Sequence, residues 1–132
     1  MIIDNEIDIN SLSPLSLAFI GDTVFDLLVR CELLEEGNRP VNILHKSASE
    51  RVCAAAQKDA ALILLPLLNA EESVIFKRGR NTHTNSSPKN QSSADYHYAT
   101  GLECLFGWLY LKGRDERIRE LYGYISEKCS DE

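Results

Sequence analysis

Apolar side chains recur along this chain at the spacing of three and four residues that marks one face of a helix. No stretch shows the alternation of period two that is expected of a strand. The 132 residues are enough for one domain with a substantial core. The pattern therefore predicts a single all-α domain, a helical bundle. We expect an acidic lead-in over residues 1–12 and helices over 14–36, from 40 to a break or kink at Pro66, over 69–80, over 93–112 and over 115–128.

The first predicted helix, over residues 14–36, is apolar nearly all round, which predicts burial on most of its sides. Ser13 and the proline after it indicate an N-terminus, and Gly37 indicates the end. Gly21 and Asp22 nevertheless lie in the middle of this helix. Glycine there costs about 1 kcal/mol relative to alanine, and a buried carboxylate needs a hydrogen-bonding partner, a cation or a proton.

Asp26 follows Asp22 by one helical turn, and Arg30 follows Asp26 by another, so the three side chains share a face. In one interpretation Asp26 pairs with Arg30, and Asp22 caps a neighbouring group. In the other, Asp26 adds a carboxylate to a site around Asp22. We favour the ion pair between Asp26 and Arg30.

A second acid, Glu103, occupies the same unusual position in the helix predicted over 93–112, where Gly101 and Gly107 allow a close approach of another helix. If the two helices pack together, Asp22 and Glu103 meet, and the repulsion between them raises one pKa strongly. A divalent cation removes this repulsion. Oxygen ligands without a Cys or His pattern favour Mg²⁺, with Mn²⁺ as a substitute, over zinc.

The net charge of −6 argues mildly against a nucleic-acid partner, but the basic residues are segregated. Between Phe76 and Gln91 there are four basic residues and no acidic one. We expect residues 81–93 to form a long polar loop, functional or mobile, whose composition suits phosphate and sugar contacts. The alternative is a merely solvated loop. A Mg²⁺ site beside such a segment indicates phosphodiester hydrolysis.

The four cysteines are scattered without a C-x-x-C pair, which gives no sign of a zinc knuckle or a thioredoxin-like motif. Cys31, Cys53 and Cys104 lie in apolar helical patterns, so we expect them to be small core residues. The sequence starts without a charged and apolar leader, and no apolar run is long enough to span a membrane. We therefore expect a cytoplasmic protein with no membrane association.

Residues 17–24 contain an aspartate directly after an Ile-Gly pair, and residues 98–110 contain a glutamate in a glycine-rich apolar helix. Both segments resemble the metal-binding helices of the ribonuclease III catalytic domain. Three short motifs are similar to its compact branch, mini-ribonuclease III. These motifs are Leu44-His45-Lys46, Arg78-Gly79-Arg80-Asn81 and Pro88-Lys89-Asn90.

The resemblance implies an all-α endoribonuclease domain that acts as a homodimer on double-stranded RNA without a separate RNA-binding domain. It also implies a role in maturing the precursor of 23S ribosomal RNA, helped by a large-subunit ribosomal protein. The central helix from Pro14 to Arg30 is the candidate for the dimer interface. A-form RNA would be recognised by its shape, phosphates and 2′-hydroxyls.

Carried over residue by residue, the resemblance makes Asp22 and Glu103 the catalytic metal ligands. Ala18 and Thr100 stand where the full-length enzymes have two further acids, which leaves fewer carboxylates for a second metal ion. The candidate RNA-binding residues are those of the basic segment and of the short motifs. They are Lys77, Arg78, Arg80, Asn81, Lys89, Asn90, His45 and Lys46.

Two other functions fit the same helical pattern. One is a non-catalytic RNA-binding or assembly module on this fold, although the presence of both Asp22 and Glu103 speaks against it. The other is an all-α interaction domain with two structural acids. A structure in which Asp22 and Glu103 lie far apart would favour that last interpretation.

Overall fold

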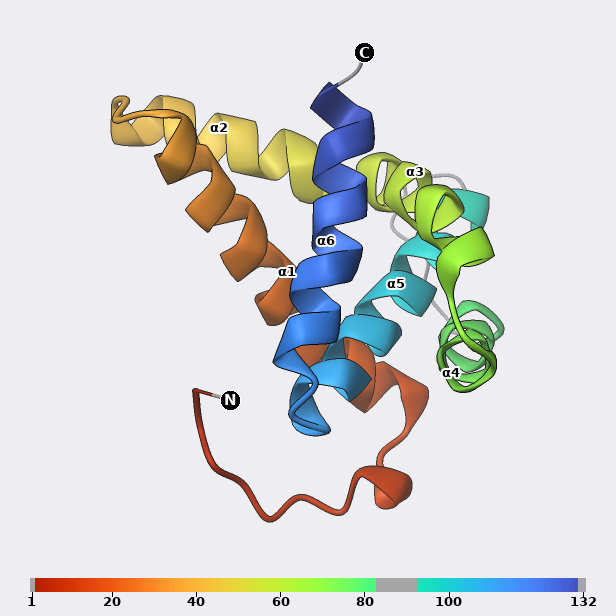
Figure 1. Ribbon diagram of the computed structural model, residues 1–132. Helices are drawn as coiled ribbons and strands as arrows, with labels where there is room; N and C mark the ends of the chain where they lie inside the picture. The colour runs from red at the N-terminus through yellow and green to blue at the C-terminus, as the bar shows by residue number, and fades with distance from the viewer. Residues whose placement is uncertain (1, 83–92, 131–132) are drawn as a thin grey trace.

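The computed structural model describes residues 2–82 and 93–130, and its regular structure is helical throughout these ranges (Figure 1). They contain no strand, so the all-α prediction is confirmed. None of the described helices combines the length and apolar content needed to cross a bilayer. The α-helices are α1 (Pro14–Glu36), α2 (Val41–Val52), α3 (Ala54–Leu64), α4 (Ala70–Arg80), α5 (Ser93–Leu111) and α6 (Asp115–Ser130), with short 3-10 turns at Ile9–Ser11 and Leu65–Leu67.

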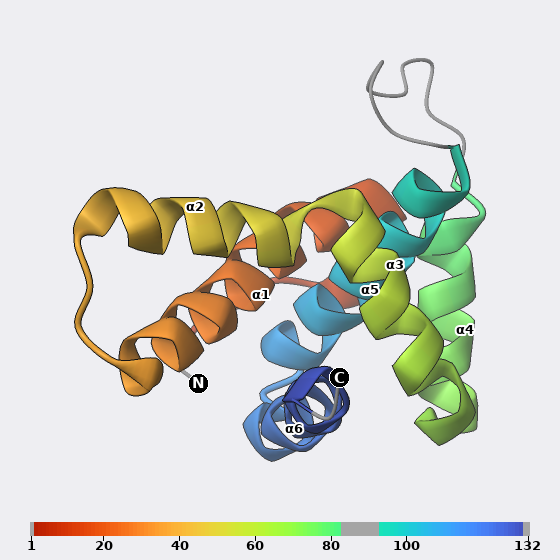
Figure 2. The same cartoon turned by 90° about the horizontal axis from the view of Figure 1, so that it is seen from above.

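Helix α5 is the centre of the fold. α1, α3 and α4 pack along it, and α6 also contacts it (Figures 1 and 2). Because neighbours cover it on several sides, its middle is more deeply buried than any other stretch of the described chain. The side chains with no solvent exposure there are Leu102, Cys104, Leu105, Phe106 and Leu109.

Two pairs of glycines let other helices approach α5 until backbones touch. A Cβ placed on Gly21 of α1 would lie 1.7 Å from the carbonyl oxygen of Glu103, and one on Gly107 would lie 2.0 Å from that of Leu17. On α4, a Cβ on Gly79 would lie 3.0 Å from the Cα of Gly101 on α5. No side chain larger than hydrogen fits at these crossings without moving a helix.

The predicted helix ends at Ser13, Gly37 and Asn69 are confirmed. The Ser13 side chain accepts a hydrogen bond from the Ser16 amide, and Gly37 ends α1 with a φ of 141°. At the start of α4, the Asn69 side chain accepts from the Glu72 amide at 2.9 Å, and the Glu72 carboxylate accepts from the Asn69 amide at 3.0 Å. These helix ends are formed by contacts between residues that are close together in the sequence, so the sequence alone is enough to predict them.

The prediction of one helix from residue 40 to Pro66 is wrong, because the chain breaks at Cys53. That residue has extended backbone angles and separates α2 from α3. The two helices serve different partners, since α2 packs against α1 and α3 packs against α5. One straight helix would not present both apolar stripes to both partners.

Helix α1 is less buried than its composition predicted. It buries one stripe against its neighbours, while several large apolar side chains on its other side remain exposed among polar ones, with Phe19 81% and Leu34 60% accessible. The prediction that Cys31 and Cys53 are core residues is also wrong, because both are exposed; Cys104 is buried as predicted. A helix that is apolar all round therefore has one side without a partner in the single chain.

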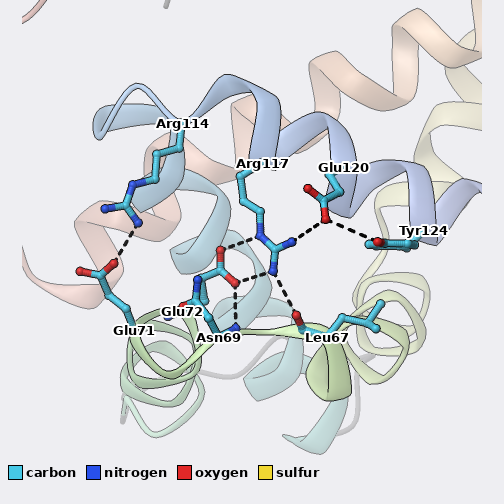
Figure 3. Close-up of polar contacts among 8 residues, drawn as sticks. All are labelled: Leu67, Asn69, Glu71, Glu72, Arg114, Arg117, Glu120 and Tyr124. Atoms are coloured by element: carbon cyan, nitrogen blue, oxygen red, sulfur yellow. Dashed lines mark hydrogen bonds and ion pairs between the residues drawn. The ribbon is translucent and has the colours of Figure 1, made fainter.

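A buried ion pair fastens α6 to the start of α4 (Figure 3). Arg117 donates from Nη2 to one carboxylate oxygen of Glu72 at 2.7 Å and from Nε to the other at 2.8 Å. Glu72 is 1% exposed. The hydrogen bonds from Arg117 hold the pKa of Glu72 below its ordinary value. Arg117 also donates to the carbonyl of Leu67 and to Glu120, so its guanidinium is fully engaged.

Replacement of Gly21 by alanine should destabilise the protein by about 3 kcal/mol or more, because the new methyl group would overlap the backbone of α5. The measurement is the free energy of unfolding from urea titration. Gly123→Ala on α6 is the matched control, since no atom lies within 4 Å of a Cβ there. That change should stabilise the helix by about 1 kcal/mol. Equal stability of Gly21→Ala and wild type would contradict the backbone contact.

Candidate functional site

Asp22 and Glu103 meet where α1 crosses α5. The residue before Asp22, Gly21, packs on the backbone of Glu103 itself, so the two acids emerge from touching segments. Their side chains lie close enough for Asp22 to raise the pKa of Glu103. Asp22 is exposed, contrary to the expectation of burial, and Glu103 is partly buried. The structure therefore places the two carboxyl groups together near the protein surface, where α1 crosses α5. The two acids do not lie far apart, as they would if each had a separate structural role.

This arrangement makes Glu103 hold a proton at neutral pH. Burial is the main cause, and the hydrogen bond with Asp22 and the charge of Asp22 add to it; together they raise the pKa of Glu103 from 4.5 to about 8. Among the described residues, no cationic side chain forms an ion pair with Asp22 or Glu103. The proton on Glu103 therefore relieves the repulsion between the two carboxyl groups, as a bound cation would otherwise do.

A third side chain, Gln57 of α3, reaches the same place. It is 2% exposed, and its amide interacts with the Glu103 carboxyl group, opposing the rise in pKa. Its Nε2 atom is nonetheless buried without a well-formed hydrogen bond among the described residues. Sequence reasoning did not identify Gln57. The available signal was an amide in the stripe that continues with Ala60, Ala61 and Leu64.

Asp26 is not part of this pair. Its carboxylate accepts a hydrogen bond from Nε of Arg30 at 2.9 Å, so the predicted ion pair is confirmed. Ala18 and Thr100, which the resemblance aligns with two further acids of the full-length ribonuclease III enzymes, are both buried. The Thr100 hydroxyl donates to the carbonyl of Tyr96 at 2.9 Å, within its own helix.

The donor set at the crossing fits a hydrated divalent cation of the Mg²⁺ type. Within residues 2–82 and 93–130, no three His, Cys, Asp or Glu side chains cluster closely enough to enclose a metal ion. Two carboxylates are nevertheless sufficient for Mg²⁺, which keeps several of its waters and is commonly held by one or two acids. The repulsion between Asp22 and Glu103 when both are ionised supplies the electrostatic reason for a cation there.

The basic last turn of α4 lies beside the same part of α5. Lys77 and Arg78 are exposed, and Nε of Arg80 donates to the side chain of Asn81 at 3.2 Å. Gly79, between them, packs on α5 next to Cys104. The charge of Arg78 reaches that residue, where it opposes the rise in thiol pKa that burial causes. The basic last turn of α4 and the pair Asp22 and Glu103 therefore lie against the same section of α5.

Two of the other predicted RNA-binding residues lie elsewhere in the described chain. His45 and Lys46 are exposed on α2, which lies at the end of the molecule away from α4 in both views (Figures 1 and 2). Lys89 and Asn90 lie outside the described residues, as does the loop predicted over 81–93 from residue 83 to residue 92.

Glu103→Gln should stabilise the protein in the presence of a chelator, by little at pH 5 and by at least about 1 kcal/mol at pH 8. Because the folded-state pKa of about 8 exceeds the ordinary value of 4.5, the folded protein binds this proton more tightly. Wild-type stability therefore falls between these two pH values, and glutamine removes the loss. Urea titrations from pH 5 to pH 8 measure the difference, and a gain that does not change with pH would contradict the proton on Glu103.

Comparison with known proteins assigns the chain to a family. The sequence profile of the Ribonuclease III domain matches residues 15–114. The chain is 46% identical to the Mini-ribonuclease 3 of Thermoanaerobacter sp. (strain X514), over 84% of its own length and 78% of that protein's. It is 35% identical to the Mini-ribonuclease 3 of Enterococcus faecalis, over 94% and 96%.

Structural comparison agrees with the sequence. A crystal structure of a protein from Fusobacterium nucleatum superposes with a TM-score of 0.81 at 30% identity, covering 91% of this chain and 98% of that one. The match extends over nearly all of both chains, so it concerns the whole helical arrangement around α5 and not one motif. Together these comparisons show that the chain belongs to the mini-ribonuclease III group of the ribonuclease III family, a family of endoribonucleases.

Proposed function

We propose that this protein is a Mg²⁺-dependent endoribonuclease that hydrolyses phosphodiester bonds in double-stranded RNA. The observation that carries the proposal is the pair Asp22 and Glu103, held in contact at a glycine crossing without a cationic side chain to neutralise it. Membership of the ribonuclease III family supports the reaction class. The resemblance to mini-ribonuclease III supports the precursor of 23S ribosomal RNA as the natural substrate, with a large-subunit ribosomal protein as helper and the cytoplasm as location.

Asp22 and Glu103 are the proposed ligands of Mg²⁺, or of Mn²⁺ in its place. When bound, such an ion polarises a phosphoryl oxygen and lowers the pKa of a water molecule. Glu103 releases its proton as the cation enters, because a ligating carboxylate must be ionised. The touching backbones at Gly21 fix the positions from which the two side chains project, and fixed ligand geometry favours reaction.

RNA would lie across the exposed side of Asp22 and the last turn of α4. Lys77, Arg78 and Arg80 supply positive charge for phosphates, and Asn81 supplies an amide for phosphate or 2′-hydroxyl contacts. Lys89, Asn90, His45 and Lys46 are further proposed contacts. The last two lie away from α4 in one chain, so they would contact a different part of a long duplex.

The proposed enzyme is a homodimer that covers the exposed apolar side of α1. Leu15, Phe19, Leu27 and Leu34 are 41%, 81%, 48% and 60% accessible in the single chain. Apolar surface of this extent on one helix is typical of an interaction site. Phe19 precedes Asp22 by less than one turn, so the interface would border the acid pair.

Asp22→Asn and Glu103→Gln should each lower the rate of duplex RNA cleavage by at least about 100-fold, because either change removes half of the proposed cation site. Asp26→Asn is the matched control on the same helix, since Asp26 is committed to Arg30, and it should keep the wild-type rate. The assay compares duplex RNA, single-stranded RNA and double-stranded DNA, each with Mg²⁺ or chelator. Unchanged duplex binding by Asp22→Asn separates loss of chemistry from loss of binding, and full activity of Asp22→Asn would refute the proposal.

Replacing both Arg78 and Arg80 by alanine should weaken duplex RNA binding without changing cation affinity. The slope of log affinity against log salt concentration should shrink by about 1 to 2, since two phosphate contacts are lost. Binding titrations at several salt concentrations measure this slope. Arg119→Ala is the control, because Arg119 is exposed on α6, and it should leave the slope unchanged. An unaltered slope in the double variant would exclude the last turn of α4 from the RNA interface.

A further inference from the structure

Gln57 is the one polar residue among the buried residues of α3, the helix that packs against α5. The other buried residues of that helix are Ala54, Ala60, Ala61 and Leu64, which form the expected apolar stripe. Gln57 occupies a position in this stripe and is 2% exposed. An apolar side chain of similar volume would serve packing equally well there, so packing alone does not account for an amide.

The amide of Gln57 faces the carboxyl group of Glu103 from inside the protein. The two side chains interact, yet Nε2 of Gln57 lacks a well-formed hydrogen bond among the described residues. A buried donor in this condition destabilises the fold, and such groups are rare enough to need a reason. Glu103 is the polar group that can account for this donor, because the other residues of the buried stripe on α3 are apolar.

We propose that Gln57 is a positioning residue, which donates a hydrogen bond from Nε2 to the carboxylate of Glu103 and so orients that carboxylate toward the cation. This inference rests on the proposed function of Asp22 and Glu103 as cation ligands. A neutral donor behind a ligating carboxylate fixes its orientation and favours its charged form. Gln57 acts through Glu103 and is too deeply buried to contact RNA.

The test replaces Gln57 by leucine, which keeps the volume and removes the donor. Mn²⁺ binding to the RNA-free protein, measured by titration calorimetry, should weaken about 10- to 100-fold. In cleavage assays the Mg²⁺ concentration for half-maximal rate should rise by a similar factor. Saturating Mg²⁺ should restore most of kcat, while KM for duplex RNA stays unchanged.

Ala60→Gly is the matched control, because it loosens the same face of α3 without removing a group that faces Glu103. It should lower the melting temperature and leave Mn²⁺ affinity unchanged. Gln57→Leu should show the reverse, with an unchanged or higher melting temperature and weaker Mn²⁺ binding. Wild-type Mn²⁺ affinity in Gln57→Leu would overturn the inference.

Gln57→Glu distinguishes positioning from direct ligation. If Gln57 contacted the cation through its own oxygen, a carboxylate there would bind Mn²⁺ more tightly than wild type does, and that result would also overturn the inference. Failure of the proposed function looks different, because the wild-type protein itself would then neither bind Mn²⁺ at Asp22 and Glu103 nor cleave duplex RNA.

Discussion

The contact between the backbones of α1 and α5 is the constraint on which the rest of this structure depends. Gly21 and Gly107 leave no room for a Cβ, so the axes of the two helices are as close as main chains allow. This closeness puts Asp22 beside Glu103, and the burial of α5 then gives Glu103 its raised pKa. A single added methyl group at the crossing would separate the acids and weaken both the fold and the site.

Two partly or fully buried glutamates in this protein show opposite pKa shifts for an instructive reason. Glu72 receives two hydrogen bonds from Arg117, so its pKa falls and its charge stabilises the junction of α4 and α6. Glu103 faces another acid, so its pKa rises. Arg117 therefore neutralises the structural acid Glu72, whereas among the described residues no cationic side chain neutralises Glu103, which we propose binds a metal ion. This difference agrees with the clustering of perturbed acids at functional sites.

The sequence was sufficient wherever a feature depended on neighbours within one turn, as at Ser13, Asn69 and the Asp26–Arg30 pair. It also indicated the acid pair, because two carboxylates in apolar helices need a shared explanation. It failed where tertiary partners decide. The break at Cys53 reflects α2 and α3 facing different helices. The exposure of Phe19 reflects which sides of α1 the other helices cover, and Gln57 could not be assigned before its stripe was known to face Glu103.

The proposed chemistry also resolves how an acidic protein binds an acidic polymer. With a net charge of −6, the protein repels RNA overall, and an ionised pair of acids at the site would add to that repulsion. A divalent cation held by Asp22 and Glu103 would reverse the local sign, and the last turn of α4 would extend the positive region along α5. Phosphate oxygens would then serve as further ligands of that cation. In the proposed site, cation and RNA would therefore each favour the binding of the other, a linkage that an acid pair neutralised by a built-in arginine would not provide.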